Sequence, residues 1–307
     1  MSNKIAVLGS INVDTTYHVE RFPQPGETIS ALSKSSAAGG KGANQAVAAV
    51  RSGAKTYFIG KVGDDNEGQF MLESLKGEGI DTTCIRVDKG HGTGTAAITL
   101  DANGQNDIMV YGGANQALTI DDLTGTASVF DDIDFLISQF ETPQVVTAAA
   151  FKEAKEHDVT TILNPAPAKT IHPDLLKYTD VITPNETESA LISGIELTDE
   201  DSMVKTAQFF ADHGVRYTLI TLGSKGVFYS TPKDHGLVPA FKVKAVDTTA
   251  AGDTFIGATA SQLDKNLDNV EEALVYGQRA SSLTVQQMGA MPSIPTGDQV
   301  KAALNRD

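Results

Sequence analysis

The 307-residue chain contains 39 Asp and Glu residues against 24 Lys and Arg residues, so its formal net charge is −15. Its apolar fraction of 40% and charged fraction of 21% are typical of a globular protein and exclude an intrinsically disordered one. The negative charge argues against nucleic acid or an anionic membrane as a partner, because the field would repel phosphate groups. If the protein binds an anionic ligand, it must do so through local backbone dipoles and a metal ion.

The single cysteine, Cys84, excludes an intrachain disulfide and favours a reducing cytoplasm. We expect Cys84 to be an ordinary packed or half-packed residue. The N-terminus passes directly into an apolar strand without the pattern of a signal peptide, and no apolar run approaches the length of a membrane span. These features predict a soluble, cytoplasmic protein.

Short apolar runs alternate with helical stretches along most of the chain. This alternation predicts an α/β fold whose mainly parallel sheet is covered on both faces, with ligands outside the carboxyl ends of the strands. The predicted strands are 5–11, 56–62, 135–140, 160–163, 181–183 and 218–222, and the predicted helices are 42–51, 67–76, 143–156 and 186–193.

Two regions interrupt the alternation. Residues 94–115 predict two strands around a turn at Asn103-Gly104, and residues 14–37 have β-branched residues on either side of a Pro-Gly turn. Together they predict a small antiparallel sheet from residues 14–37 and 94–112, beside a main domain of residues 1–13, 38–93 and 113–307. Such a sheet is either a lid over a strand-end cleft or a decorative edge hairpin.

Several common chemistries are excluded by missing motifs. The chain has no G-x-x-x-x-G-K-[ST] loop, no G-x-G-x-x-G run and no G-x-S-x-G elbow. Its six histidines have no H-x-x-x-H spacing, which argues against a zinc site.

The N-terminal part of the chain contains two chemically loaded segments. "GSINVD" (9–14) predicts a strand that ends in a turn carrying Asn12 and Asp14, either to bind hydroxyl groups or simply because these residues favour turns. "AAGGKGANQAVAA" (37–49) opens a helix with glycines that allow close backbone approach to a ligand. The alternative for this segment is a flexible turn with a solvated lysine.

Three further segments lie in the C-terminal half of the chain. "DVITPNETE" (180–188) places Asn185 and Glu188 either around hydrated Mg²⁺ or at a helix start that favours acidic residues. "TLGSKG" (221–226) is either a turn beneath a nucleotide or a hairpin turn. "DTTAAGD" (247–253) leads into an apolar helix, where Asp253 is either a helix cap or a carboxylate beside an anion pocket.

These segments, in this order, resemble the ribokinase branch of the PfkB carbohydrate kinase family. The resemblance covers essentially the whole chain and also includes "GDD" (63–65), "GGAN" (112–115), "NPAPA" (164–168) and "GAMPSIP" (289–295). It implies a ribokinase-like three-layer α/β/α fold, with a small antiparallel β lid. It also implies transfer of the γ-phosphoryl group of ATP to O5 of D-ribose, giving ribose 5-phosphate.

The resemblance also assigns roles to individual residues. It implies that Asp253 is the catalytic base and that the backbone N–H groups of Ala250, Ala251 and Gly252 form the anion hole. Catalysis of phosphoryl transfer is mostly positioning and charge stabilisation, which explains a carboxylate beside that hole. The implied sugar-binding residues are Asn12, Asp14, Gly40, Lys41, Asn44 and Glu141, and the implied nucleotide-binding residues are Asn185, Thr221, Gly223, Gly226 and Gln278.

Two cations are implied as cofactors. The resemblance places Mg²⁺ near Asn185 and Glu188 through water, and K⁺ beside the anion hole. For K⁺, the matching positions are Asp247, Thr249, Thr284, Gln287, Gly289 and Ser293. Gln278 stands where relatives more often carry Asn or His, and Gln287 stands where they often carry Arg. In relatives the lid also pairs between subunits, which implies a homodimer.

Three alternatives remain at this point. One is a kinase for deoxyribose or another small sugar on the same fold, although Asn12 and Asp14 favour a sugar with all its ring hydroxyls. The second is a catalytically silent sugar-binding protein, which would be expected to lack Gly252 or Asp253. The third is a nicotinamide-dependent oxidoreductase, which lacks its glycine fingerprint here.

Overall fold

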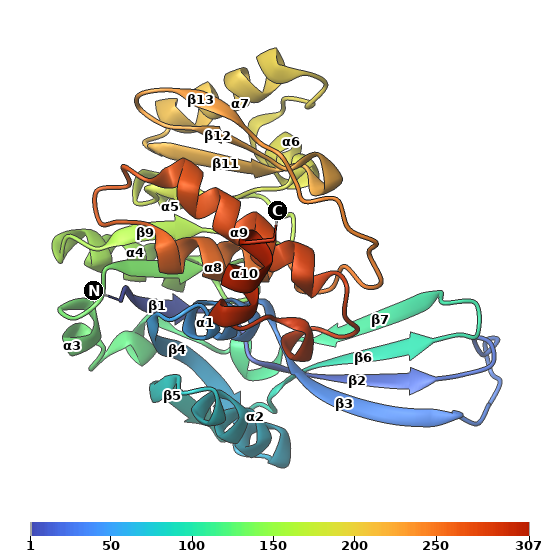
Figure 1. The fold of residues 1–307 in the computed structure, drawn as a ribbon. Helices are drawn as coiled ribbons and strands as arrows, with labels where there is room; N and C mark the ends of the chain where they lie inside the picture. Colours follow the sequence, from blue (N-terminus) through green and yellow to red (C-terminus); the bar gives the residue numbers. More distant parts are fainter. Residues whose placement is uncertain (1, 307) are drawn as a thin grey trace.

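The computed structural model describes residues 2–306, which form a large sheet between two layers of helices and a smaller sheet that projects to one side (Figure 1). The large sheet has nine strands in the order β13-β12-β11-β10-β9-β8-β1-β4-β5. All neighbours from β5 to β11 pair in parallel, and β12 and β13 add an antiparallel edge. The strands are β1 (Lys4–Leu8), β4 (Lys55–Gly63), β5 (Asp81–Asp88), β8 (Phe135–Ser138), β9 (Thr160–Leu163), β10 (Val181–Ile182), β11 (Tyr217–Thr221), β12 (Val227–Ser230) and β13 (His235–Val238).

The helices cover both faces of this sheet. They are α1 (Lys41–Arg51), α2 (Asn66–Gly77), α3 (Ala127–Phe130), α4 (Gln144–Glu156), α5 (Pro173–Lys177), α6 (Glu186–Ser193), α7 (Glu200–Asp212), α8 (Ala251–Gln262), α9 (Val270–Thr284) and α10 (Gly297–Leu304).

The central strand β1 illustrates how the sequence builds the layers. Its side chains alternate between two separate cores, because successive residues of a strand point to opposite faces. Ile5 and Val7 join the core beneath α1, α2, α8 and α9, whereas Ala6 and Leu8 join the core beneath α4, α5 and α7. The predicted three-layer α/β/α fold is confirmed.

The smaller sheet has the order β3-β2-β6-β7, from β2 (Asn12–His18), β3 (Ser33–Gly39), β6 (Gly94–Leu100) and β7 (Asn106–Tyr111). The hairpin at Asn103-Gly104 joins β6 and β7 in antiparallel pairing as predicted, and β2 and β3 are also antiparallel. The two hairpins meet through β2 and β6, which pair in parallel. We refer to these four strands as the side sheet.

One local prediction was wrong. Asn12 and Asp14 do not lie in a turn after the first strand, because β1 ends at Leu8 and both residues belong to β2. The turn itself is formed by residues 9–11, and pairing with both β3 and β6 then makes the next residues a strand.

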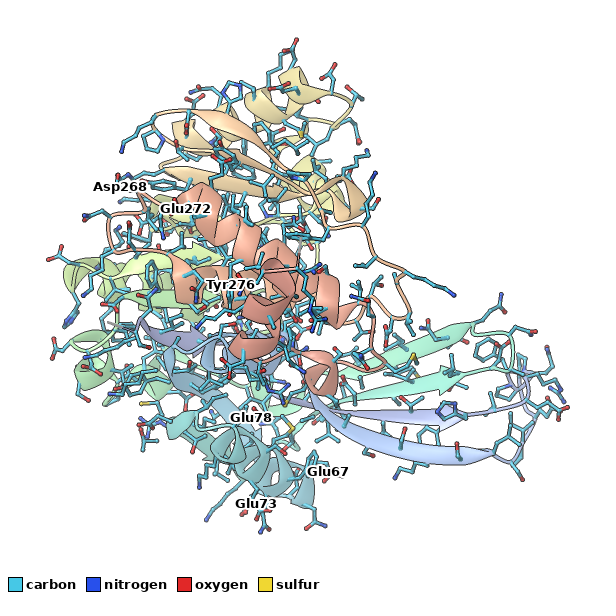
Figure 2. All side chains as sticks on the ribbon, in the orientation of Figure 1. Glu67, Glu73, Glu78, Asp268, Glu272 and Tyr276 are labelled. Atoms are coloured by element: carbon cyan, nitrogen blue, oxygen red, sulfur yellow. The ribbon has the colours of Figure 1, made fainter. Side chains whose placement is uncertain are left out.

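The excess negative charge lies on the outside of the molecule. Exposed carboxylates project from α2 at Glu67 and Glu73 and from the α9 region at Asp268 and Glu272 (Figure 2). Cys84 is buried in β5 with 8% exposure, as expected. Within residues 2–306, none of the helices combines the length and apolar character needed to cross a bilayer.

Candidate active site

The candidate site lies where the carboxyl ends of the central strands meet the starts of α1 and α8. The chain reaches it after β1, at Asn12 and Asp14, and again at the start of α1, with Lys41 and Asn44. Glu141 follows β8, and Asp253 comes from α8. The fold therefore brings together residues that are more than 200 positions apart in sequence.

Asp253 does not cap α8. It is the third residue of a helix that begins at Ala251, and the helix start has no side-chain cap. Instead, the carboxylate receives one amide hydrogen bond on each oxygen, from Asn44 Nδ2 at 3.1 Å and from Gln45 Nε2 at 2.9 Å. Both donors come from α1, so the carboxylate of Asp253 points from α8 toward α1.

The charge state of Asp253 reflects its burial. The residue is 6% exposed, and loss of hydration raises the pKa of its carboxyl group. The positive charge of Lys41 and the amides of Gln45 and Asn44 oppose that rise. The carboxylate in turn raises the pKa of Lys41, which keeps the ammonium charged beside it.

The first turn of α8 presents open backbone donors. Ala250, immediately before the helix, has the left-handed φ of 60° that non-glycine residues rarely adopt. Ala251 N donates to Thr248 O at 3.2 Å, whereas Gly252 N and Asp253 N meet no acceptor within residues 2–306. A Cβ built at Gly252 would have no neighbour within 4 Å. This geometry leaves space and N–H groups for an anion.

A second cluster forms at the base of the side sheet. Asn12 is 6% exposed, and its Oδ1 accepts a hydrogen bond from Asn115 Nδ2 at 2.8 Å. Glu141 Oε2 accepts hydrogen bonds from Ser10 Oγ at 2.6 Å and Lys41 N at 3.1 Å. Oriented amide and carboxylate groups of this kind suit a polyhydroxylated ligand.

Asp14 belongs to the same cluster. Burial, with a smaller contribution from the nearby charge of Glu141, raises the pKa of Asp14 from 3.8 to about 6. Gly39 on β3, which pairs with Asn12, leaves room for the Asp14 carboxylate, because a Cβ there would lie 2.1 Å from Asp14 Oδ2. The next glycine, Gly40, has a φ of 94° and turns the chain into α1.

Asn185 and Glu188 form a reciprocal capping box at the start of α6. Asn185 N donates to Glu188 Oε2 and Glu188 N donates to Asn185 Oδ1, each at 2.8 Å. Glu188 is buried, which raises the pKa of its carboxyl group, and its Oε1 makes no hydrogen bond within residues 2–306. That free carboxylate oxygen fits a hydrated Mg²⁺, which prefers oxygen ligands and retains waters.

The predicted nucleotide segment is a hairpin turn. Thr221 ends β11 beside Asn185, with which it forms a parallel bridge, and Gly223–Lys225 is a single 3-10 turn before β12. Gly226 has a φ of 115°, and a Cβ there would lie 2.1 Å from Val238 O. Gln278 is buried on α9.

The predicted K⁺ positions lie in two loops that meet near the start of α8. Asp247 accepts hydrogen bonds from Thr249 N and Gly289 N, each at 2.9 Å. Burial raises the pKa of Asp247, but these hydrogen bonds and that of the Thr249 hydroxyl outweigh it and hold the pKa below its usual range. The loops thus hold an ionised carboxylate, an oxygen group of the kind that a hard cation prefers.

Three side chains among the predicted K⁺ residues are directed elsewhere. Thr284 Oγ1 donates to Thr254 Oγ1 at 3.1 Å, and Ser293 Oγ donates to Ala290 O at 2.7 Å. Gln287 is exposed, and its backbone N–H bonds to Thr284 O at 3.0 Å. The Thr284 and Ser293 hydroxyls therefore already have partners within the protein.

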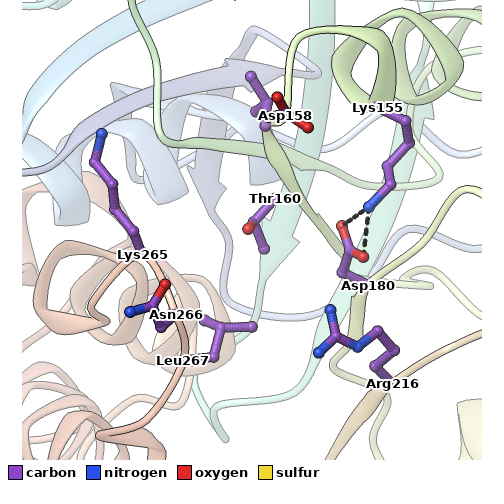
Figure 3. Close-up of a pocket in the computed structure, with 9 residues that line it drawn as sticks. Lys155, Asp158, Thr160, Asp180, Arg216, Lys265, Asn266 and Leu267 are labelled. Atoms are coloured by element: carbon purple, nitrogen blue, oxygen red, sulfur yellow. Dashed lines mark hydrogen bonds and ion pairs between the residues drawn. The ribbon is translucent and has the colours of Figure 1, made fainter.

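A cavity of about 290 Å³ lies at the amino-terminal ends of the central strands, opposite the candidate site (Figure 3). It opens where β9, β10 and β11 begin, beside Thr160, Asp180 and Arg216. Lys155 is already paired there with Asp180 at 2.6 Å. Because ligands of open parallel sheets bind at the carboxyl ends, this cavity is separate from the candidate site.

Sequence reasoning missed four buried amides that support the site: Asn115, Gln45, Gln139 and Asn164. Asn115 binds both polar groups of Ile11 and orients Asn12. Asn115 and Asn164 lie within the "GGAN" and "NPAPA" segments, and Gln45 follows Asn44 directly. Their position in those segments was the available signal, but their contacts depend on the folded structure.

The chain is similar to known carbohydrate kinases. The family described as pfkB family carbohydrate kinase matches residues 2–297. The chain is 49% identical to the bifunctional ribokinase/ribose-5-phosphate isomerase A of Fructilactobacillus sanfranciscensis, covering 99% of this chain and 56% of that protein. It thus spans only about half the length of that relative.

Two further relatives match along their whole length. The chain is 48% identical to a ribokinase of Staphylococcus aureus, covering 98% of this chain and 99% of that protein. The structure of Arabidopsis thaliana ribokinase complexed with ribose and ATP superimposes with a TM-score of 0.91, at 32% identity and 99% coverage of both chains.

Proposed function

This chain belongs to the pfkB family of carbohydrate kinases, and we propose that within this family it is a ribokinase, which phosphorylates D-ribose at O5 with ATP. The observation that carries the proposal is the position of Asp253. Its buried carboxylate, held by two amides, lies at the start of a helix in which Gly252 N and Asp253 N have no acceptor within residues 2–306. A base and an anion hole in one turn are what phosphoryl transfer to an alcohol requires.

In the proposed reaction, Asp253 accepts the proton of the O5 hydroxyl as that oxygen bonds to the γ-phosphorus. The bond from the γ-phosphorus to the bridging oxygen of ADP breaks, and ADP leaves. The turn of Ala250, Ala251 and Gly252 directs backbone N–H groups and the helix dipole at the transferring group. Gly252 N is the clearest donor, because Ala251 N already bonds to Thr248 O.

The proposed sugar site lies between β2 and α1. Asn44 supports it most directly, because its Nδ2 binds Asp253 while its Oδ1 is buried without a partner within residues 2–306. A ribose hydroxyl donating to this oxygen would satisfy it and would lie next to the base. The other proposed sugar-binding residues are Asn12, Asp14, Gly40, Lys41 and Glu141.

We propose that ATP binds along the ends of β10 and β11, at Asn185, Thr221, Gly223 and Gly226, with Gln278 nearby. Mg²⁺ would be held there by the nucleotide phosphates and by water bound to Asn185 and Glu188, and it would neutralise phosphate charge. No cluster of three acidic, His or Cys ligands occurs in residues 2–306, which fits a metal held largely by water and substrate. K⁺ would lie beside Asp247 and strengthen the anion hole.

The side sheet is proposed as both the lid and the dimer surface. Its edge strand β7 is exposed throughout, with Ile108 55%, Met109 70% and Val110 66% exposed. A contiguous apolar edge strand is a surface that monomers normally avoid. We expect a cytoplasmic protein that forms a homodimer through this strand. Sedimentation analysis of Val110→Asp tests the dimer, with Asp107→Asn on the same strand as the control. Equal masses for wild type and Val110→Asp would contradict a dimer formed through β7.

The function is tested by measuring ADP release with ATP, Mg²⁺ and K⁺ in the presence of D-ribose, 2-deoxyribose, fructose or adenosine. Turnover mainly with ribose supports the proposal. Preference for another sugar would show that the assignment of the sugar pocket around Asn12 and Asp14 to ribose is wrong, while the proposed base and anion hole would stand. Absence of turnover with every acceptor would favour a catalytically silent sugar-binding protein.

A further inference from the structure

Behind Asp253, on the side away from Asn44, lies a continuous row of buried amides. Gln139 Nε2 donates to Gln45 Oε1 at 2.6 Å, and Gln45 Nε2 donates to Asp253 Oδ1 at 2.9 Å. Gln45 Nε2 also donates to Asn164 Oδ1 at 3.1 Å, and Asn164 Nδ2 donates to Thr183 O at 3.1 Å. Gln45 and Gln139 are both 0% exposed.

The direction of each hydrogen bond in this row follows from the charge of Asp253. An ionised carboxylate can only accept hydrogen bonds, so Gln45 must turn its NH₂ group toward it. Gln45 Oε1 then faces Gln139, which must also present its NH₂ group. The row ends at Gln139 Oε1, which is buried without a partner within residues 2–306 and lies against the backbone of Gly9.

We propose that Gln45 is a positioning residue for phosphoryl transfer, and that Gln139 locks its amide in the orientation that holds Asp253 ionised and aimed at the acceptor hydroxyl. This inference rests on the proposed kinase function and adds to it a second line of residues. Gln45 is expected to act only through Asp253.

A buried unpartnered Gln139 oxygen supports this role over a purely structural one. Leaving a buried acceptor unsatisfied costs free energy. Rotating both amides would give Gln139 Oε1 a donor on Gln45, but it would also turn the Gln45 carbonyl toward the Asp253 carboxylate. The arrangement therefore favours the electrostatics of Asp253 over the hydrogen bonding of Gln139. Sites that tolerate such a cost are commonly functional.

Charged groups around Asp253 determine what the loss of this donor would do. Lys41 from α1 stabilises the carboxylate, whereas Glu141 after β8 and Glu188 on α6 repel it. With two repelling carboxylates and one ammonium, the neutral amides of Gln45 and Asn44 supply the remaining stabilisation. Removal of the Gln45 amide raises the pKa of Asp253 further, so the base loses its charge at a higher pH.

The test uses purified full-length protein and compares Gln45→Met, which keeps the length of the side chain without its amide, with wild type. We expect kcat to fall about 10- to 100-fold, as for loss of a hydrogen bond to a charged group, while the KM for ribose changes little. The acid limb of the kcat/KM profile should move up by about one pH unit. The Ser138→Ala variant is the matched control, since Ser138 is equally buried, ends β8 immediately before Gln139, and contacts Thr147 instead.

A second variant, Gln139→Met, keeps the Gln45 side chain but removes the hydrogen bond that fixes the orientation of its amide. We expect a smaller fall in kcat and a shift of the acid limb in the same direction, and this variant decides the question if Gln45→Met does not fold. A wild-type pH profile and kcat in folded Gln45→Met or Gln139→Met would overturn the inference. Wild-type protein without activity on any sugar would instead count against the proposed function.

Discussion

Asn44 Nδ2 donates a 3.1 Å hydrogen bond to Asp253 Oδ2, while Asn44 Oδ1, on the same amide, is buried and unpartnered within residues 2–306. The NH₂ group of Asn44 is thus held by the proposed base, while its carbonyl oxygen is left to accept a hydrogen bond from a ligand. The open acceptor lies within an amide's width of the carboxylate. A sugar hydroxyl donating to it would anchor the ring beside the base and leave a second hydroxyl free to give its proton to Asp253, so the proposed sugar binding and catalysis would share this side chain.

The Asp253→Asn variant is expected to fold normally and to lose about 10²- to 10⁴-fold in turnover, the range for a positioned acid–base group. The amide preserves the shape of the side chain but cannot accept the hydroxyl proton. Coupled ADP-release kinetics and a thermal unfolding curve measure the two effects separately. Near-native turnover would remove Asp253 from the role of base.

Asp14 provides a prediction about pH and stability. Its pKa rises from 3.8 to about 6 on folding, so between these values the folded state binds more protons than the unfolded state. The stabilisation is fully present below about pH 4 and is lost as the pH rises through about 6. Asp14→Asn should therefore weaken the decline in unfolding temperature across this range, measured by circular dichroism.

The control for this experiment is Asp107→Asn, an exposed residue on β7. That variant should retain the pH dependence of the wild type. If Asp14→Asn and wild type lose stability in parallel between pH 4 and 7, Asp14 does not titrate as its burial indicates.

The same titration affects sugar binding. Protonated Asp14 loses one acceptor for ribose hydroxyls, so the KM for ribose should increase as the pH falls below about 6. Initial rates at several ribose concentrations between pH 5 and 8 measure this increase. The Asp14→Asn variant should have a raised KM that varies less over this range, whereas an equally steep variation would assign the effect to another group.

The sequence predicted the large sheet well because its strands are short apolar runs separated by helices. Val181–Ile182 and Glu186–Ser193 illustrate this, since a buried pair is followed at once by a capping box that starts the helix. The hairpin at Asn103-Gly104 was equally readable, because a local turn determines its pairing.

The parts that could not be predicted depend on contacts between distant segments. Asn12 favoured a turn by composition, but pairing with Gly39 and Gly94 on two other strands places it in β2. Likewise, the sequence indicates only that Gln45 lies in a helix. The packing of α1 against α8 is what brings its side chain to Asp253. Local preferences do not encode such pairings.

Gly94 tests the orientation of Asn12. A Cβ at Gly94 would lie 2.2 Å from both Asn115 Nδ2 and Asn12 Oδ1, so Gly94→Ala should force this pair apart and raise the KM for ribose about tenfold. Gly77→Ala on α2 is the control, because a Cβ there has no neighbour within 4 Å. Equal KM values for both variants would show that Asn12 does not bind the sugar.

The final prediction concerns the monovalent cation. Replacing K⁺ with Na⁺ at constant ionic strength should lower kcat if the proposed cation site beside Asp247 binds the larger ion. Asp247→Asn removes the charge, and with it the strongest reason for a cation to bind, so its kcat should be low and nearly equal in the two salts. Asp247 also fixes Gly289 N and Thr249 N, and a thermal unfolding curve distinguishes loss of the cation from loss of the loop. Equal wild-type rates in K⁺ and Na⁺ would contradict the proposed K⁺ site.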